Sequence, residues 1–86
     1  MKGPEISYQE LEKGLRVIIT AYSSKFAKHV DIYCVVYAVL DNEVSFVHNN
    51  LTTNELSMFS AFLTPKHKLV DDRHVEVKVF KSLEVK

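Results

Sequence analysis

Cys34 carries the only thiol in this 86-residue sequence and is the first candidate for covalent chemistry. A cysteine nucleophile must ionise, which requires partial exposure and a nearby cation or base. Cys34 lies in the middle of the apolar run Val30 to Leu40, where the neighbouring positions supply neither. Because free cysteine is among the most buried residue types, we expect Cys34 to fill the core as an inert thiol. A single cysteine also excludes an internal disulfide and is typical of a reducing compartment.

Histidine and aspartate residues near the C-terminus raise the question of a metal site. His67 and His74 flank Asp71 and Asp72, and imidazole and carboxylate groups can bind zinc or a harder ion. Their spacing, however, matches neither a zinc finger nor the HExxH motif of metalloproteases. The sequence therefore predicts no metal site.

Motifs of the common enzyme classes are missing from the sequence. Gly3 and Gly14 are the only glycines, so no glycine-rich loop can hold a phosphate. Ser23 and Ser24 lack the context of a nucleophile elbow. No two carboxylates lie on adjacent rigid segments in apolar surroundings, which acid–base catalysis would require. We therefore expect a protein that is not an enzyme and uses no cofactor.

Length and composition indicate one small globular domain spanning residues 1–86, with residues 1–5 as a loose lead-in. Apolar residues make up 47% of the chain, and 11 basic side chains balance 11 acidic ones. Zero net charge provides no overall field to attract nucleic acid or acidic lipid. There is no apolar run of about 18 residues for a membrane span, and the first residues lack the apolar core of a signal peptide. We expect a cytoplasmic protein without a membrane partner.

Val30 to Leu40 is the segment around which we expect the fold to be organised. β-branched and aromatic residues dominate it, and both of its alternating faces are apolar, which favours a central strand. Residues 44–48 return along this strand, so we expect a hairpin over about 30–48. One face of the strand has no polar atom except the thiol, and it consists of Val30, Ile32, Cys34, Val36, Ala38 and Leu40.

The turn of this hairpin decides which residues face one another. A three-residue loop, Asp41 to Glu43, places Phe46 opposite Ala38 on the fully apolar face. A two-residue loop places Phe46 with Tyr37 on the other face. The pattern favours the three-residue loop because it keeps the apolar face continuous.

Residues 6–11 and 51–56 share one helix-start pattern. Ser7 and Thr52 occupy N-cap positions, and each is followed three residues later by a glutamate that can reach back to the cap. We therefore expect two short helices, the second running to about Leu63 before Pro65 excludes its continuation.

The segment from 15 to 22 has two interpretations. Apolar residues three and four apart from Tyr8 to Phe26 would suit one long helix. Alternatively, Gly14 ends a short helix in a left-handed cap and residues 15–22 form a strand. Four consecutive β-branched residues, Val17 to Thr20, favour the strand slightly.

Alternation from Val75 onward predicts a C-terminal strand over about 74–85 with one solvated face. The expected fold is a small single-domain α+β protein. It would have an antiparallel sheet, built on the central hairpin at 30–48 and the C-terminal strand at 74–85, packed by two short helices. The alternative is a small β-barrel, SH3-like or OB-like, with a short helix.

The second face of the central strand is the candidate binding site. A helix-rich chain of 86 residues has little left to cover this face, so we expect an exposed apolar patch, unless a barrel closes over it. Tyrosine suits protein interfaces because its ring offers a large contact area and its hydroxyl tolerates water. The predicted partner-binding residues are Tyr33, Val35, Tyr37 and Val39, with Lys25 and Lys28 near the rim.

These features predict a small non-enzymatic module that binds another protein or a second copy of itself. Short neutral chains without active-site motifs are typical of adaptors, subunits and inhibitors, including those that phages and mobile elements encode. The alternative is a single-stranded nucleic-acid-binding domain whose tyrosines stack on bases beside Arg16, Lys25 and Lys28. Nucleic acid is the less favoured partner because Asp31 and Asp41 bracket the same strand and the net charge is zero.

Overall fold

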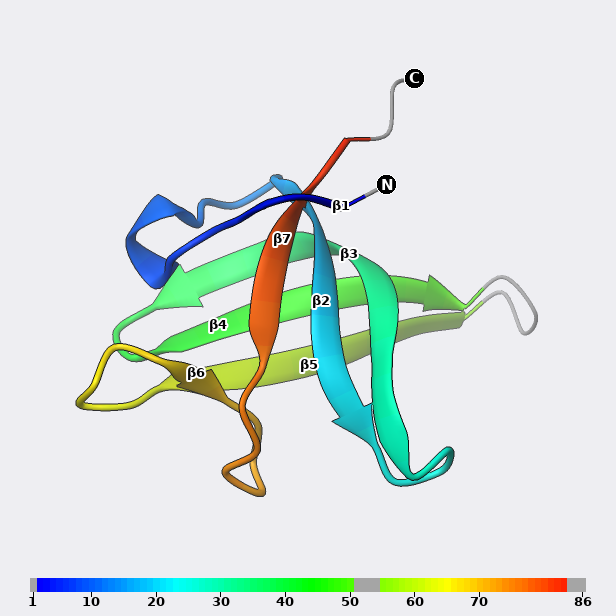
Figure 1. Cartoon of the computed structure of the whole chain (residues 1–86). Helices are drawn as coiled ribbons and strands as arrows, with labels where there is room; N and C mark the ends of the chain where they lie inside the picture. The colour runs from blue at the N-terminus through cyan, green and yellow to red at the C-terminus, as the bar shows by residue number, and fades with distance from the viewer. Residues whose placement is uncertain (1, 51–54, 84–86) are drawn as a thin grey trace.

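The computed structural model of the chain describes residues 2–50 and 55–83 (Figure 1). The described residues form a seven-stranded antiparallel sheet in the order β1-β7-β2-β3-β4-β5-β6. The one helical element among the described residues is a single 3-10 turn, η1 (Tyr8–Glu10). The strands are β1 (Lys2–Glu5), β2 (Arg16–Ser23), β3 (Lys28–Leu40), β4 (Glu43–Asn50), β5 (Glu55–Leu63), β6 (Leu69–Val70) and β7 (Lys78–Ser82).

The sheet folds back on itself to enclose a core. Figure 1 shows β2 and β7 crossing in front of β4 and β5, with the long strand β3 belonging to both layers. A bridge between Val70 and Glu76, with the Val77 amide donating to the Leu69 carbonyl at 2.8 Å, links β6 to the segment just before β7. The enclosed core consists of Leu11, Val17, Ile19, Ala21, Cys34, Val36, Val44, Phe46, Ala61, Leu69, Val77 and Val79.

The second predicted helix is wrong, because residues 55–63 form strand β5. This strand pairs with β4 from Asn50↔Glu55 to Glu43↔Phe62. Phe59 and Ala61 point into the core, and Met58 and Phe62 point to solvent, which is the period-two alternation of a strand. The proposed cap residue Thr52 lies outside the described residues. A full-length hydrogen-bonding partner in β4 thus overrides a local pattern that suited a helix equally well.

The first predicted helix is reduced to η1. The Ser7 backbone amide donates to Oε1 of Glu10 at 3.0 Å, as the helix-start pattern requires. The turn nevertheless ends at Leu11, and Gly14 adopts a left-handed φ of 93° before β2 begins. The strand interpretation of residues 15–22 is therefore correct. An α+β fold packed by two helices is not, since the protein is a small β-sheet domain whose strands supply almost all of the core.

A β-bulge at Tyr37 corrects the predicted register of the central hairpin. Val36 lies opposite Phe46, but Ala38 lies opposite Ser45, so Tyr37 is an extra residue in β3. The turn has two residues, Asp41 and Asn42, with Asn42 at a φ of 63°, and the predicted three-residue loop is wrong. Phe46 still reaches the core because the bulge compensates for the shorter turn.

The bulge also reverses which residues face inward at the end of β3. Val39 packs against the core, and Leu40 is 54% exposed. Alternation without a bulge predicted the opposite for both residues. The extra residue at Tyr37 shifts the phase of the strand by one position, so the two side chains exchange faces.

The C-terminal strand is shorter than the predicted span of 74–85. Val77 and Val79 are buried, as the alternation predicted, but β7 proper covers only Lys78–Ser82. Leu83, expected on the inner face, is 45% exposed, and Val85 lies outside the described residues. Residues 71–75 instead form a tight turn in which the Asp71 amide donates to the Val75 carbonyl at 2.9 Å.

Candidate protein-interaction surface

The outer face of β3, β4 and β5 carries a continuous group of apolar side chains. Residues directly opposite one another on paired strands share a face and lie in contact range. Val35, Val47 and Met58 form one such row across the three strands. A second row, Leu40, Glu43 and Phe62, lies at the turn end of β3 and β4. Pairing between the strands therefore gathers residues from three separate segments onto one surface.

Tyr37 lies between these two rows. Its bulge position places it with Ala38 beside Ser45, whose hydroxyl lies 3.4 Å from that of Ser60 on β5. Ser45 is buried and its hydroxyl has this partner, so the centre of the face is a satisfied polar pair rather than a charge. The exposed Tyr37 side chain lies beside this uncharged pair, and it also lines a hollow with Glu12 and Lys13.

Most of the exposed large hydrophobic residues in the described part of the chain are on this face. Of the eight large hydrophobic side chains that are substantially exposed, six belong to it, and Phe26 and Leu83 lie elsewhere. We call these six residues the outer patch, and they are Tyr33 (52% exposed), Val35 (41%), Tyr37 (53%), Leu40 (54%), Met58 (59%) and Phe62 (36%).

Tyr33 extends the outer patch over β2. Its cross-strand neighbour Ile18 is only 2% exposed although it is not part of the enclosed core. Ile18 is flanked on its other side by Phe80 of β7, over whose ring the Lys2 ammonium lies at 4.6 Å. The two aromatic neighbours bury Ile18, so this end of the outer face is already a packed layer.

The structure separates the residues that the sequence grouped together. Tyr33, Val35 and Tyr37 share the outer face, but Val39 is half-buried on the core side of the bulge and leaves the predicted site. Lys25 and Lys28 are exposed on the β2–β3 hairpin, and Lys25 lines the same hollow as Tyr33. Their role in binding remains a prediction.

Leu40, Met58 and Phe62 are members of the outer patch that sequence reasoning missed. Met58 and Phe62 were assigned to a helix, and Leu40 was assigned to the core. A strand interpretation of residues 55–63 would have placed Met58, Ser60 and Phe62 on one face by alternation. Leu40 could be found only by locating the bulge.

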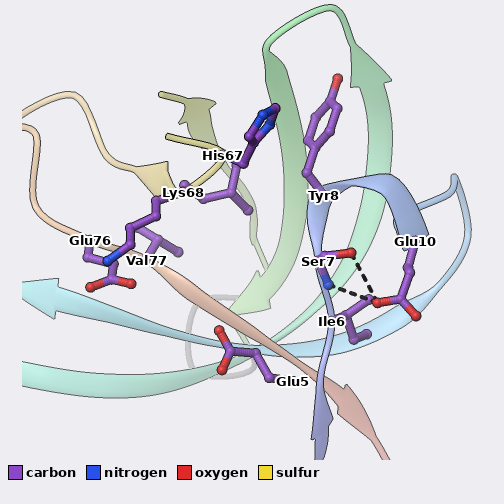
Figure 2. A pocket seen from close by; sticks show the side chains of 10 residues that line it. Glu5, Ile6, Ser7, Tyr8, Glu10, His67, Lys68, Glu76 and Val77 are labelled. Carbon is purple, nitrogen blue, oxygen red and sulfur yellow. Dashed lines mark hydrogen bonds between the residues drawn. The ribbon is translucent and has the colours of Figure 1, made fainter. Parts of the chain in front are cut away.

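A hollow of about 350 Å³ opens between η1 and β6, and Figure 2 shows the side chains that line it. Three of them are carboxylates, from Glu5, Glu10 and Glu76, and Figure 2 shows Glu76 beside Lys68 while Glu10 lies across the hollow on η1. Hydrogen bonds from the Ser7 backbone amide, and then from its hydroxyl, hold the pKa of Glu10 below its ordinary value. A catalytic acid at neutral pH needs a raised pKa, so this geometry does not favour acid catalysis by Glu10.

The histidines and aspartates are not gathered into a ligand set. Within residues 2–50 and 55–83, no three histidine, cysteine, aspartate or glutamate side chains are placed to hold a metal ion. Asp71, which the sequence offered as a ligand, is 2% exposed and accepts hydrogen bonds from the Arg73 and Val75 backbone amides. Its oxygens therefore stabilise a turn.

Cys34 is buried in the core, as the sequence predicted, and burial raises the pKa of its thiol to about 12. At neutral pH the thiol is therefore protonated and shielded. We expect a thiol-specific reagent such as DTNB to label the native protein at least about a hundredfold more slowly than the urea-denatured protein. Labelling at nearly equal rates would show that the thiol is accessible and would reopen a catalytic role.

In the described part of the chain, no helix has the length and apolar character needed to span a bilayer.

Comparison with known proteins identifies no relative of this chain: no protein-family model, curated protein or solved structure matches it.

Proposed function

We propose that this protein is a non-enzymatic module that binds another protein through the outer patch. The observation that carries the proposal is the concentration of six exposed hydrophobic side chains on three adjacent strands. Contiguous exposed apolar surface of this kind marks interaction sites in soluble domains. An adaptor, a subunit or an inhibitor would each use such a face in the same way.

The chemistry of the outer patch favours a protein partner over nucleic acid. Within its rows the one charged residue is Glu43, and Arg16 is the base next to Val35 along the ladder. Lys13 lines a hollow with Tyr37, but Glu12 lies in the same lining and opposes its charge. A surface that binds single strands combines its aromatic rings with several cations that follow the phosphates. Two tyrosines, a methionine and branched aliphatic side chains instead match the composition of the buried centre of protein interfaces.

The residue on which this proposal depends most is Tyr37, at the centre of the patch. Tyr37→Ala is expected to weaken partner binding by about 2 kcal/mol, roughly thirtyfold in Kd, because central aromatic anchors carry most of the binding energy. The partner would be recovered by cross-linking and pull-down from the native cell, and its affinity then measured by calorimetry with purified components.

Leu83→Ala is the matched control, since Leu83 is a large hydrophobic residue with 45% exposure that lies outside the patch. It should leave the affinity unchanged. If Tyr37→Ala also lowers thermal stability, Met58→Ser tests the same face from β5 without touching the bulge. Equal affinities for Tyr37→Ala, Met58→Ser and wild type would contradict the proposal.

Salt dependence separates the two classes of partner. Binding through the outer patch should change little between 50 and 200 mM salt, whereas nucleic-acid binding should weaken by roughly a hundredfold or more over this range. Recovery of nucleic acid with steep salt dependence would favour the nucleic-acid alternative. A stable complex made only of this chain would identify the partner as a second copy.

A further inference from the structure

Strand β5 has an open edge along most of its length. On one side it pairs with β4 over eight residue pairs, but on the other side β6 covers only Phe62 and Leu63. The Leu63 amide donates toward β4, to the Asn42 carbonyl at 2.9 Å. Because backbone groups alternate in direction along a strand, the amides and carbonyls of Met58 and Ser60 point away from β4. Among the described residues, no strand pairs with them there.

The turn at Asp71 is the reason that β6 stops. Val70 pairs with Phe62, and a straight continuation of β6 would bring the next residues alongside Ser60 and Met58. The buried Asp71 carboxylate instead accepts hydrogen bonds from the Arg73 and Val75 amides, at 2.8 and 3.0 Å, and turns the chain away. The edge that β6 begins to cover is therefore left open by a specific local structure.

The other edge of the sheet is protected in a way that β5 is not. Edge strand β1 is short and carries Pro4 between the charged residues Lys2 and Glu5, which discourages pairing with another strand. The part of β5 from 57 to 63, SMFSAFL, has neither a charge nor a proline. A long, uncharged, open edge is a site for strand addition.

A hollow of about 550 Å³ has one β5 residue, Phe59, in its wall. The rest of its lining includes His48 of β4, Tyr33 of β3 and the β2–β3 hairpin. An added strand would place every second side chain on the inner side of the sheet, next to Phe59. Apolar side chains at those positions would fill the hollow.

The charge around the hollow is positive where it is not already neutralised. Asp31 accepts a hydrogen bond from Thr20 at 2.7 Å and forms an ion pair with Lys2 at 3.2 Å. Arg73 is paired with Asp71 at 3.3 Å. Lys25 lines the hollow with its ammonium above the Phe26 ring, and no described carboxylate forms an ion pair with it. An incoming segment with acidic side chains would complement Lys25.

We propose that the β5 edge binds an extended acidic segment of another protein as an additional strand that continues the line of β6. Main-chain hydrogen bonds to Met58 and Ser60 hold this segment. Its inward-facing positions carry two kinds of side chain, apolar ones beside Phe59 and acidic ones toward Lys25, and both occupy the hollow. This site borders the outer patch, to which the Met58 and Tyr33 side chains belong. It differs from the patch in using the backbone of β5, which the proline and alanine variants below test separately.

The probe is a blocked eight-residue peptide in which serine alternates with the inward-facing residues, two valines followed by two glutamates. It is compared with the same peptide in which lysine replaces glutamate. Titration followed by NMR should give saturable shifts at Met58 and Ser60, with an affinity at least about tenfold higher for the acidic peptide. Hydrogen exchange at those two amides should slow by at least about tenfold in the complex.

Ser60→Pro and Ser60→Ala form a matched pair, since both remove the hydroxyl but only proline removes the outward amide. Ser60→Pro should abolish binding of the acidic peptide and Ser60→Ala should retain it. Met58→Pro and Met58→Ala repeat the comparison if Ser60→Pro fails to fold, as judged by circular dichroism.

Three results would overturn the proposal. The first is an acidic peptide that gives no saturable shifts at Met58 and Ser60 at concentrations up to about 1 mM. The second is equal binding by the proline and alanine variants. The third is protection of Met58 and Ser60 in the protein alone that rises with its concentration, since this would assign the edge to a second copy of the chain.

Discussion

Phe46→Ala is expected to lower the free energy of unfolding by about 3–5 kcal/mol. Phe46 is completely buried at the centre of β4, between Val36 on β3 and Phe59 on β5, and its ring centroid lies 6.4 Å from that of Phe59. Truncation removes this burial and leaves a cavity that a short sheet cannot close. Small domains have little stability in reserve, so a large share of the total would be lost. Urea unfolding monitored by circular dichroism measures the loss.

Phe26→Ala is the control for this experiment because Phe26 is 59% exposed at the β2–β3 hairpin. It should change the free energy of unfolding by less than about 0.5 kcal/mol. Phe46→Leu, which keeps most of the buried volume, should cost about 1–2 kcal/mol and gives a measurable value if Phe46→Ala does not fold. A Phe46→Ala protein as stable as Phe26→Ala would mean that Phe46 is not in the core and that the register across the bulge is different.

Asp71→Ala is expected to destabilise the protein by about 2–3 kcal/mol, the second largest effect. The 2% exposed carboxylate accepts hydrogen bonds from the Arg73 and Val75 amides and from the Arg73 guanidinium, which also donates to the Tyr22 carbonyl at 3.0 Å. Alanine would leave both turn amides without their acceptor and release Arg73 from β2. The neighbouring exposed residue supplies the control, and Asp72→Ala should have an effect of less than about 0.5 kcal/mol.

The contribution of Asp71 should depend on pH in a defined direction. Burial raises the pKa of this carboxyl, but hydrogen bonds from the Val75 and Arg73 amides and the Arg73 charge outweigh it, and the net result is a pKa below the ordinary 3.8. A group whose pKa is lowered on folding stabilises the protein above its unfolded-state pKa. Its contribution is lost as pH falls through the lower folded-state value.

Comparing wild type with Asp71→Asn separates the pH-dependent contribution of Asp71 to stability from the contributions of the other carboxylates. The stability difference between the two proteins should stay constant from neutral pH to about pH 4 and shrink below that. Urea titrations at several pH values measure it. A difference that grows on acidification would mean that the folded protein favours the protonated form of Asp71, against the hydrogen bonding described above.

Several elements could be predicted from the sequence because their signal is local. The period-two alternation of Val30 to Val36 fixes which side of β3 faces the core, and it correctly places Cys34 inside and Tyr33 and Val35 outside. The left-handed conformation of Gly14 could be predicted because only a residue without Cβ adopts a φ of 93° at no cost, although the turn itself already ends at Leu11. These features depend on the chemistry of a few neighbouring residues.

The tertiary structure decided the rest, because two local patterns were compatible with more than one fold. Residues 59 and 63 are apolar at helical spacing and residues 59, 61 and 63 at strand spacing, and only the free edge of β4 selects the strand. The phase shift at Tyr37 depends on how β3 must bend to pair with β2 and then with β4, which no alternation pattern encodes. The outer patch results from the strand conformation of β5 and from the bulge at Tyr37, and the open edge results from the strand conformation of β5. Hydrogen bonding between distant strands therefore determined where the surface of this protein is apolar and where its sheet remains unpaired.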